Sequence, residues 1–362
     1  MTPLPAFAAC AGAPSDRAVV RAISVLLLGA LLLVGAPKLQ AQNPIAQQLQ
    51  QQAEATRALL APDALRVFVC GSASPLGANP DREQACIAVV AGGRMFLVDV
   101  GDGSNTNLQL GGLPMARLHT VFLTHFHSDH IASIPDVNLG SWVAGRPEPL
   151  VVAGPEGVET VVEGLNRAYA LDRSYRVAHH GEELLPPALG VMAARTLEPG
   201  VVFDEDGLKV TAFAVDHDPV HPAFGYRFDY GGRSVVVSGD TIRSESLIAA
   251  SKGADLLLHD AMAQQAVQML QRTRAQIPGD RVAKILEDIQ TYHASVSEVA
   301  AVAKEAGVRQ LALYHLVPAV DNPMVTSQFQ SAGPGTIVVR DGQLFEMPSG
   351  SEEVTHRLLF ER

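Results

Sequence analysis

The stretch "THFHSDH", residues 124–130, decides how the rest of this sequence is interpreted. It holds three histidines and one aspartate in seven residues and follows directly on the apolar run "TVFL". Imidazole nitrogens and carboxylate oxygens are ligands that suit Zn²⁺. His125 and His127 alternate, so both rings can face one point, while Asp129 and His130 can face a second point nearby. The stretch therefore predicts half of a two-metal site rather than a solvated, histidine-rich loop.

Three further residues with ligand side chains end apolar segments later in the chain. "LKVTAFAVDH" ends on His217, "RSVVVSGD" on Asp240 and "RQLALYH" on His315. Short apolar runs of this kind are typical of buried strands. Because strand ends in a layered α/β protein can converge on one edge, we expect these residues to meet the histidine cluster. They would complete a pair of sites in which a water bound between two ions ionises near neutral pH.

Several stretches carry a resemblance to a known family. "THFHSDH" resembles the His-x-His-x-Asp-His signature of the metallo-β-lactamase superfamily, whose fold is a four-layer αββα sandwich that holds two metals. The chain is also similar to the branch that contains ribonuclease Z, metallo-β-lactamase-type arylsulfatases and related phosphodiesterases. The stretches that carry this second likeness are "GSASP", "VDVG" with Asp99, "GPEG", "HPAFGYRF", "SGDT", and "HAS" followed by "LALYHL". The resemblance covers roughly residue 65 to the last strands and implies an α/β, αββα catalytic domain.

The resemblance also implies a set of metal ligands for two Zn²⁺ ions, with Mn or Fe as alternatives. These ligands are His125, His127 and His217 for the first metal, Asp129, His130 and His315 for the second, and Asp240 as the bridge. In ribonuclease Z the ligand at the place of His217 usually lies six residues before the glycine of a Gly-Tyr pair. Here His217 lies eight residues before Gly225 and His221 lies four before it. We prefer His217 because it ends its strand directly.

His293 is the candidate residue that best indicates the type of reaction. It opens a segment in which Ser295 and Glu298 form a capping box, a helix-start signal. In the family branch, a histidine in this setting assists the leaving group or stabilises an anionic centre, a role that suits a phosphate or sulfate ester. Asp260 stands where the branch often has Glu and could orient His293, so the candidate catalytic residues are Asp129, His293 and Asp260. The alternative for His293 is a structural hydrogen bond at a helix start.

The N-terminus has the pattern of a secretory signal. Arg17 and Arg21 precede an apolar run of 15 residues, and a small residue, Ala41, stands at the expected cleavage point. We therefore expect residues 1–41 to be removed and the protein to be periplasmic or secreted, without membrane attachment. The alternative is an uncleaved anchor helix, for which 15 residues are short, since a span needs about 20.

The remainder divides into a Gln-rich segment, 42–62, and a catalytic domain, 63–362. Within the domain, residues 261–292 form a helical insertion that could roof the site as a lid or pack on the body as a helix pair. Two cysteines remain after signal removal, Cys70 and Cys86. In an exported protein such a pair favours a disulfide over two free buried thiols.

Charge constrains the substrate. The net charge is −11, and removal of three basic residues and one acid with the signal leaves 24 basic against 37 acidic residues, or −13. The segment between "GPEG" and "LEPG" lacks the basic arm by which ribonuclease Z holds tRNA. We expect a dinuclear-metal hydrolase that cleaves a small sulfate or phosphodiester by a metal-bound hydroxide, with no nucleic-acid partner. A homodimer is compatible with the sequence, and tRNA 3′ processing is not the expected physiological role. The alternative is a lactonase or β-lactamase-like acyl hydrolase.

Overall fold

The computed structural model describes residues 43–77 and 79–361. The expected signal peptide, residues 1–41, lies outside the described residues. Helix α2 (Pro44–Leu59) covers most of the Gln-rich segment. The chain divides into two compact units, Met1–Ala53 and Glu54–Arg362, and the second contains both sheets and the whole candidate site.

Two mixed β-sheets form the centre of the second unit. The first has eight strands in the order β15-β14-β1-β2-β3-β4-β5-β6, and the second has seven in the order β13-β12-β11-β10-β9-β8-β7. The first sheet consists of β1 (Ala64–Gly71), β2 (Cys86–Ala91), β3 (Arg94–Val98), β4 (Leu118–Phe122), β5 (Val151–Gly154), β6 (Ala193–Thr196), β14 (Gln343–Pro348) and β15 (Thr355–Leu358). The second consists of β7 (Gly200–Glu205), β8 (Leu208–His217), β9 (Val220–Tyr230), β10 (Arg233–Val237), β11 (Leu256–Met262), β12 (Gln310–Val317) and β13 (Ile337–Val338).

The main core lies between the two sheets. Val67 and Phe96 of the first sheet belong to one buried cluster with Tyr226 and Leu258 of the second. Strands β1, β2 and β10 are buried along their whole length, which explains why their sequences are nearly continuous apolar runs.

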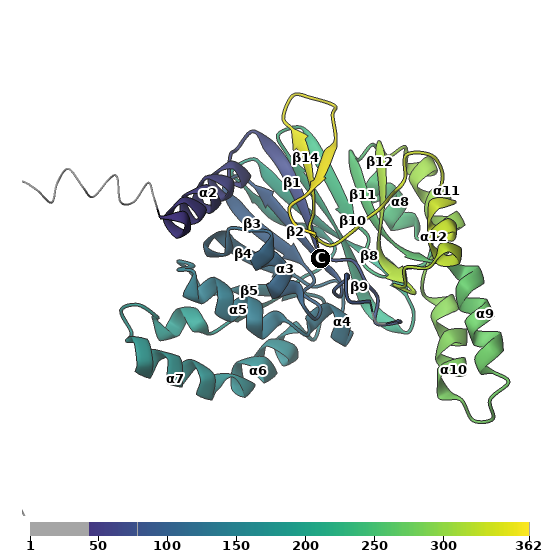
Figure 1. Cartoon of the computed structure of the whole chain (residues 1–362), viewed down its shortest axis with the longest axis horizontal. Helices are drawn as coiled ribbons and strands as arrows, with labels where there is room; N and C mark the ends of the chain where they lie inside the picture. Colours follow the sequence, from purple (N-terminus) through teal and green to yellow (C-terminus); the bar gives the residue numbers. More distant parts are fainter. Residues whose placement is uncertain (1–42, 78, 362) are drawn as a thin grey trace, which may run out of the picture. The chain divides into compact units, whose positions relative to one another are not determined.

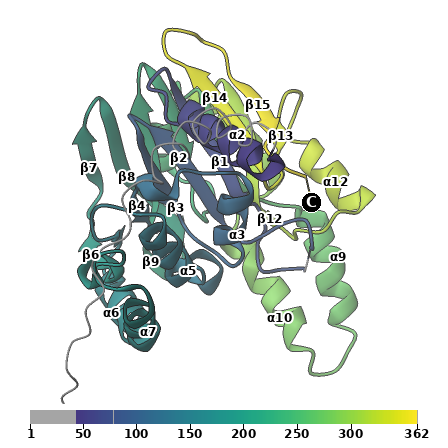
Figure 2. The same cartoon turned by 60° about the vertical axis from the view of Figure 1, so that its left-hand side comes forward.

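Helices cover the outer face of each sheet (Figures 1 and 2). On the first sheet, Leu108 and Ile134 pack from their helices into a cluster with residues of β1 to β5. On the second, Leu247, Val299 and Phe329 do the same. The helices are α3 (Ser104–Leu110), α4 (Ser128–Ile131), α5 (Ile134–Val143), α6 (Val158–Ala168), α7 (Ala170–His180), α8 (Glu245–Ser251), α9 (Gln264–Arg274), α10 (Arg281–Asp288), α11 (Val296–Ala306) and α12 (Pro323–Gln330). The predicted αββα class is confirmed.

Local signals in the sequence account for several boundaries. Ser295 and Glu298 form the capping box that starts α11. Gly307 ends this helix in the left-handed conformation, with φ of 65°. The turn between β9 and β10 contains Gly231 and Gly232, both with positive φ, as tight hairpin turns require.

The cysteine pair and the helical insertion are both found in the structure. Cys70 and Cys86 form a disulfide between β1 and β2, with their Cα atoms 5.0 Å apart. Residues 261–292 contain α9 and α10, which both views show side by side, extending away from the sheets (Figures 1 and 2). A lid function for this pair stays a prediction.

Candidate metal centre

The candidate ligands meet where strands from both sheets end. His125 follows β4 of the first sheet, while His217 ends β8, Asp240 follows β10 and His315 lies near the end of β12, all of the second sheet. Strands β4, β10 and β12 are almost entirely buried up to that point, and β8 alternates between buried and exposed residues, so the buried side chains of each strand hold the polar residue at the sheet edge. The convergence expected from the sequence is what the structure has.

One cluster consists of His125, His127, His217 and Asp240. Each offers one nitrogen or oxygen atom, and these atoms all lie within 4.8 Å of one another. Nε2 of His125 and Nε2 of His217 lie 3.9 and 4.0 Å from Oδ2 of Asp240. His221, the alternative to His217, is instead exposed and pairs with Asp218. The geometry therefore favours His217.

A second cluster consists of Asp129, His130 and His315, whose ligand atoms again lie within 4.8 Å of one another. Oδ2 of Asp129 is 3.1 Å from Nε2 of His315. Asp240 also reaches this cluster, with Oδ2 3.3 Å from Nε2 of His130 and Oδ1 3.4 Å from Nδ1 of His315. A carboxylate that approaches both clusters has the position of a bridging ligand.

Three buried atoms show that these residues fit a pair of cations. Nε2 of His130, Oδ1 of Asp240 and Nδ1 of His315 form no hydrogen bond with any described residue, although each has a polar neighbour within 3.5 Å. A buried polar atom without a partner costs about 1–3 kcal/mol. A metal ion can bind such unpaired lone pairs where several of them converge on one point. The nitrogen and oxygen donors suit Zn²⁺, Mn²⁺ or Fe²⁺.

The charges around the two clusters favour cation binding. Burial lowers the pKa of His125 well below its usual value and also lowers the pKa of His127 and His217. These three rings are therefore neutral, which is the form that binds metals. Burial lowers the pKa of His130 too, but Asp240, Asp99 and Asp129 raise it more. The negative charge that attracts a proton to His130 would attract a cation in the same way.

Neighbouring residues fix the orientation of the ligand rings. Nδ1 of His130 donates to Oδ2 of Asp99 at 2.8 Å, which leaves Nε2 free for a metal. Nδ1 of His217 donates to the backbone carbonyl of Tyr292 at 3.1 Å. Asp99 and His315 both have positive φ, of 59° and 42°. Strained backbone of this kind tends to occur at functional sites.

The candidate acid–base residues lie beside the clusters. Nδ1 of His293 donates to Oδ2 of Asp260 at 3.1 Å, and one ring nitrogen of His293 lies within 4.8 Å of ligand atoms of Asp240 and His315. His293 can therefore serve as a proton donor or as a further ligand. Sequence reasoning missed His259, whose Nδ1 lies 3.0 Å from Oδ1 of Asp260. The motif "LLHDA" contained the signal, a histidine directly before the aspartate.

Comparison with known proteins identifies the family. A model of the "Beta-lactamase superfamily domain" matches residues 95–316. Ribonuclease Z of Mycobacterium bovis (strain BCG / Pasteur 1173P2) is 40% identical over 259 residues, which cover 71% of this chain and 87% of the relative. Ribonuclease Z of Mycobacterium marinum is 38% identical, over 71% of this chain and 88% of the relative. The chain belongs to the metallo-β-lactamase superfamily. It is a metal-dependent hydrolase of this fold with ribonuclease Z-like relatives.

Solved structures of the superfamily share the fold. The metallo-β-lactamase fold protein YhfI from Bacillus subtilis has a TM-score of 0.55 and 20% identity, over 78% of this chain and 99% of that one. The short form of human tRNase Z has a TM-score of 0.56 and 20% identity, with the same coverage. A diphosphatase from the PhnP family has a TM-score of 0.55 and 16% identity, over 79% of this chain and 99% of that one. At these identities the likeness establishes the fold alone.

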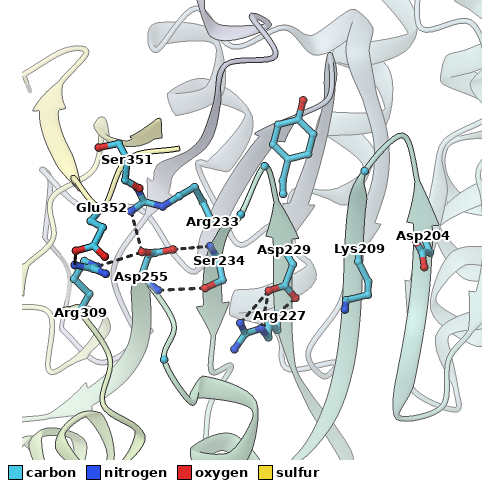
Figure 3. A pocket seen from close by; sticks show the side chains of 15 residues that line it. Asp204, Lys209, Arg227, Asp229, Arg233, Ser234, Asp255, Arg309, Ser351 and Glu352 are labelled. Carbon is cyan, nitrogen blue, oxygen red and sulfur yellow. Dashed lines mark hydrogen bonds and ion pairs between the residues drawn. The ribbon is translucent and has the colours of Figure 1, made fainter. Parts of the chain in front are cut away.

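A large cavity in this metallo-β-lactamase fold lies away from the metal centre. It measures about 640 Å³ and is lined by Arg233 and Ser234 at the start of β10 and by Asp255 just before β11 (Figure 3). Most of its charged side chains are paired with one another: Asp255 accepts from Arg233 and Arg309, and Arg227 donates to Asp229. The basic and acidic side chains that line the cavity are equal in number, and none of the candidate metal ligands is among its lining residues.

The arginines of α6 and α7 are engaged within the fold. On α6 and α7, Arg167 and Arg176 each pair with an acidic residue four positions earlier, Glu163 and Asp172. Arg173 donates to a backbone carbonyl. This part of the metallo-β-lactamase fold therefore presents no cluster of unpaired cations among the described residues. Among residues 43–77 and 79–361, no helix has the length and apolar character needed to cross a bilayer.

Proposed function

We propose that this protein hydrolyses small phosphodiesters, with sulfate esters as a second candidate class, at a dinuclear metal centre. The observation that carries the proposal is the hydrogen bond between His293 and the buried carboxylate of Asp260, beside the two clusters. An acid–base pair at this place suits a reaction in which an oxygen leaving group must take up a proton. The name ribonuclease Z of the Mycobacterium relatives supports a phosphodiester bond as the bond that is cleaved.

The reaction exchanges one oxygen on phosphorus for another. Two divalent cations at the clusters, Zn²⁺ being our proposal, would supply Lewis acidity and a water of lowered pKa. A water oxygen bonds to phosphorus, one of its protons passes to solvent, and the bond from phosphorus to the leaving oxygen breaks. Because Nδ1–H of His293 donates to Asp260, the proton that passes to this oxygen is the one on Nε2 of the doubly protonated ring. Solvent then restores the proton on His293.

Asp129 has a supporting role in the proposed mechanism. Burial raises the pKa of Asp129, but the neighbouring His130 and His315 lower it more, so the carboxylate stays ionised. An ionised carboxylate can accept a hydrogen bond from the attacking water and orient it. In this scheme Asp129 both holds a cation and positions the nucleophile.

We further propose that the natural substrate is small rather than a tRNA, and that the protein is exported. The paired arginines of α6 and α7 and the net charge of −11 argue against a polyanionic partner. The Cys70–Cys86 disulfide fits an oxidising compartment such as the periplasm. Cleavage of precursor tRNA at rates comparable to those for small diesters would contradict this part of the proposal.

The test compares His293→Ala and Asp260→Asn with the wild-type protein on bis(4-nitrophenyl) phosphate, 4-nitrophenyl sulfate and a chromogenic lactone. Loss of the proton donor should lower kcat for the diester about 10²- to 10⁴-fold in His293→Ala, with unchanged metal content. A drop in metal stoichiometry would mean that His293 is a ligand. Lactone turnover that both variants retain in full, without diester turnover in the wild type, would support the acyl-hydrolase alternative.

A further inference from the structure

Tyr292 lies against the metal centre on the side of His293. Its ring centroid is 5.1 Å from the ring of His217, with the two planes perpendicular at 89°, and 4.9 Å from the ring of His293. Its backbone carbonyl, not its side chain, holds Nδ1 of His217. The hydrogen bond by which Tyr292 orients the ligand therefore does not depend on the side chain, whose ring also borders the centre.

The other neighbours of Tyr292 fix its ring in place. It packs, half-buried, on an apolar cluster at the foot of α9 and α10 that includes Met262, Leu286 and Val317. The hydroxyl forms no hydrogen bond with any described residue. Burial raises the pKa of this hydroxyl, and nearby carboxylates, among them Asp240, add to the shift, so the phenol stays neutral. A neutral aromatic surface thus borders the centre.

We propose that Tyr292 is a specificity-determining residue whose ring forms one wall of the leaving-group subsite and favours flat aromatic leaving groups. This inference rests on the proposed function, since it requires that the leaving group lie beside His293. A group that receives a proton from His293 must come within hydrogen-bond reach of that ring. The ring of Tyr292 is then its next neighbour, and aromatic rings at such separations attract one another in offset or edge-to-face arrangements.

The experiment measures binding of two stable phosphonates, phenylphosphonate and methylphosphonate, to the metal-loaded protein by calorimetry. Tyr292→Leu should reduce the preference for the phenyl over the methyl compound by about 5-fold, because an aromatic pair contributes about 1 kcal/mol. Tyr292→Phe should retain the preference. Tyr169→Leu, which alters an exposed tyrosine elsewhere, is the matched control and should change neither affinity.

The outcomes separate this inference from the proposed function. A Tyr292→Leu variant that keeps the phenyl preference overturns the inference, as does a wild-type protein without that preference. An equal loss of both affinities together with bound metal would show that the side chain is structural, and would also overturn it. Diester turnover in the wild type is measured in parallel, so that a protein that binds phosphonates without hydrolysing diesters contradicts the proposed function alone.

Discussion

The replacement Asp99→Asn should weaken the second metal site selectively. Asp99 is buried and its two oxygens accept hydrogen bonds from the backbone nitrogen and hydroxyl of Thr124 and from Nδ1 of His130, each at 2.8 Å. Asparagine tolerates the positive φ of this position, so the backbone should not be disturbed. The amide NH₂ of asparagine cannot accept the proton of His130 Nδ1.

The expected magnitude follows from the tautomer of His130. If the new amide donates to Nδ1, the ring proton moves to Nε2, the atom that faces the second cluster, and this nitrogen can no longer bind a metal. Loss of such an outer hydrogen bond typically costs about 10- to 100-fold in metal affinity, or roughly 1.4–2.7 kcal/mol. The affinity of the first cluster, which His125, His127 and His217 supply, should change much less.

The assay is competition between the protein and a chromogenic chelator, which resolves the affinities of the two metal equivalents. Asp341→Asn is a matched control, because Asp341 is also a buried aspartate, and it accepts from Ser72, Asn107 and a backbone nitrogen, outside the metal clusters. It should lower stability without a selective change in metal affinity. Two equivalents bound by Asp99→Asn with wild-type affinities would refute the tautomer argument.

Three further outcomes are expected. Acidification should release the second cation first, because carboxylates raise the pKa of His130 and His315, whereas burial lowers the pKa of the first-cluster histidines. Equilibrium dialysis at a series of pH values measures the release of each cation, and simultaneous release of both would contradict the prediction. Replacing Cys70 and Cys86 by alanine should lower the unfolding free energy by about 3 kcal/mol in denaturant titration, since the bridge closes a short loop. Gly225→Ala should cost about 1–3 kcal/mol by the same titration, because its Cβ would lie 2.5 Å from an aromatic ring; wild-type stability would show that this ring can move.

Much of the candidate site could be predicted from local patterns. The spacing within "THFHSDH" and the ligand side chains at the ends of apolar strands indicated which residues would meet. Local patterns suffice here because the burial of a strand is encoded in consecutive residues. A polar residue at the end of such an apolar run therefore lies at the edge of the sheet. The choice between His217 and His221 was harder, since both lie close to that edge in the chain.

The tertiary structure alone decided how the ligands are supported. The sequence by itself determined the set of candidate histidines and aspartates, because motif spacing is a local property, and it determined the αββα class through the family resemblance that those motifs carry. The hydrogen bond of Asp99 to His130, that of His293 to Asp260 and the contact of the Tyr292 ring with His217 join residues that lie far apart in the chain. Such contacts depend on strand register and on how the two sheets pack, and these are fixed only when the whole core is formed.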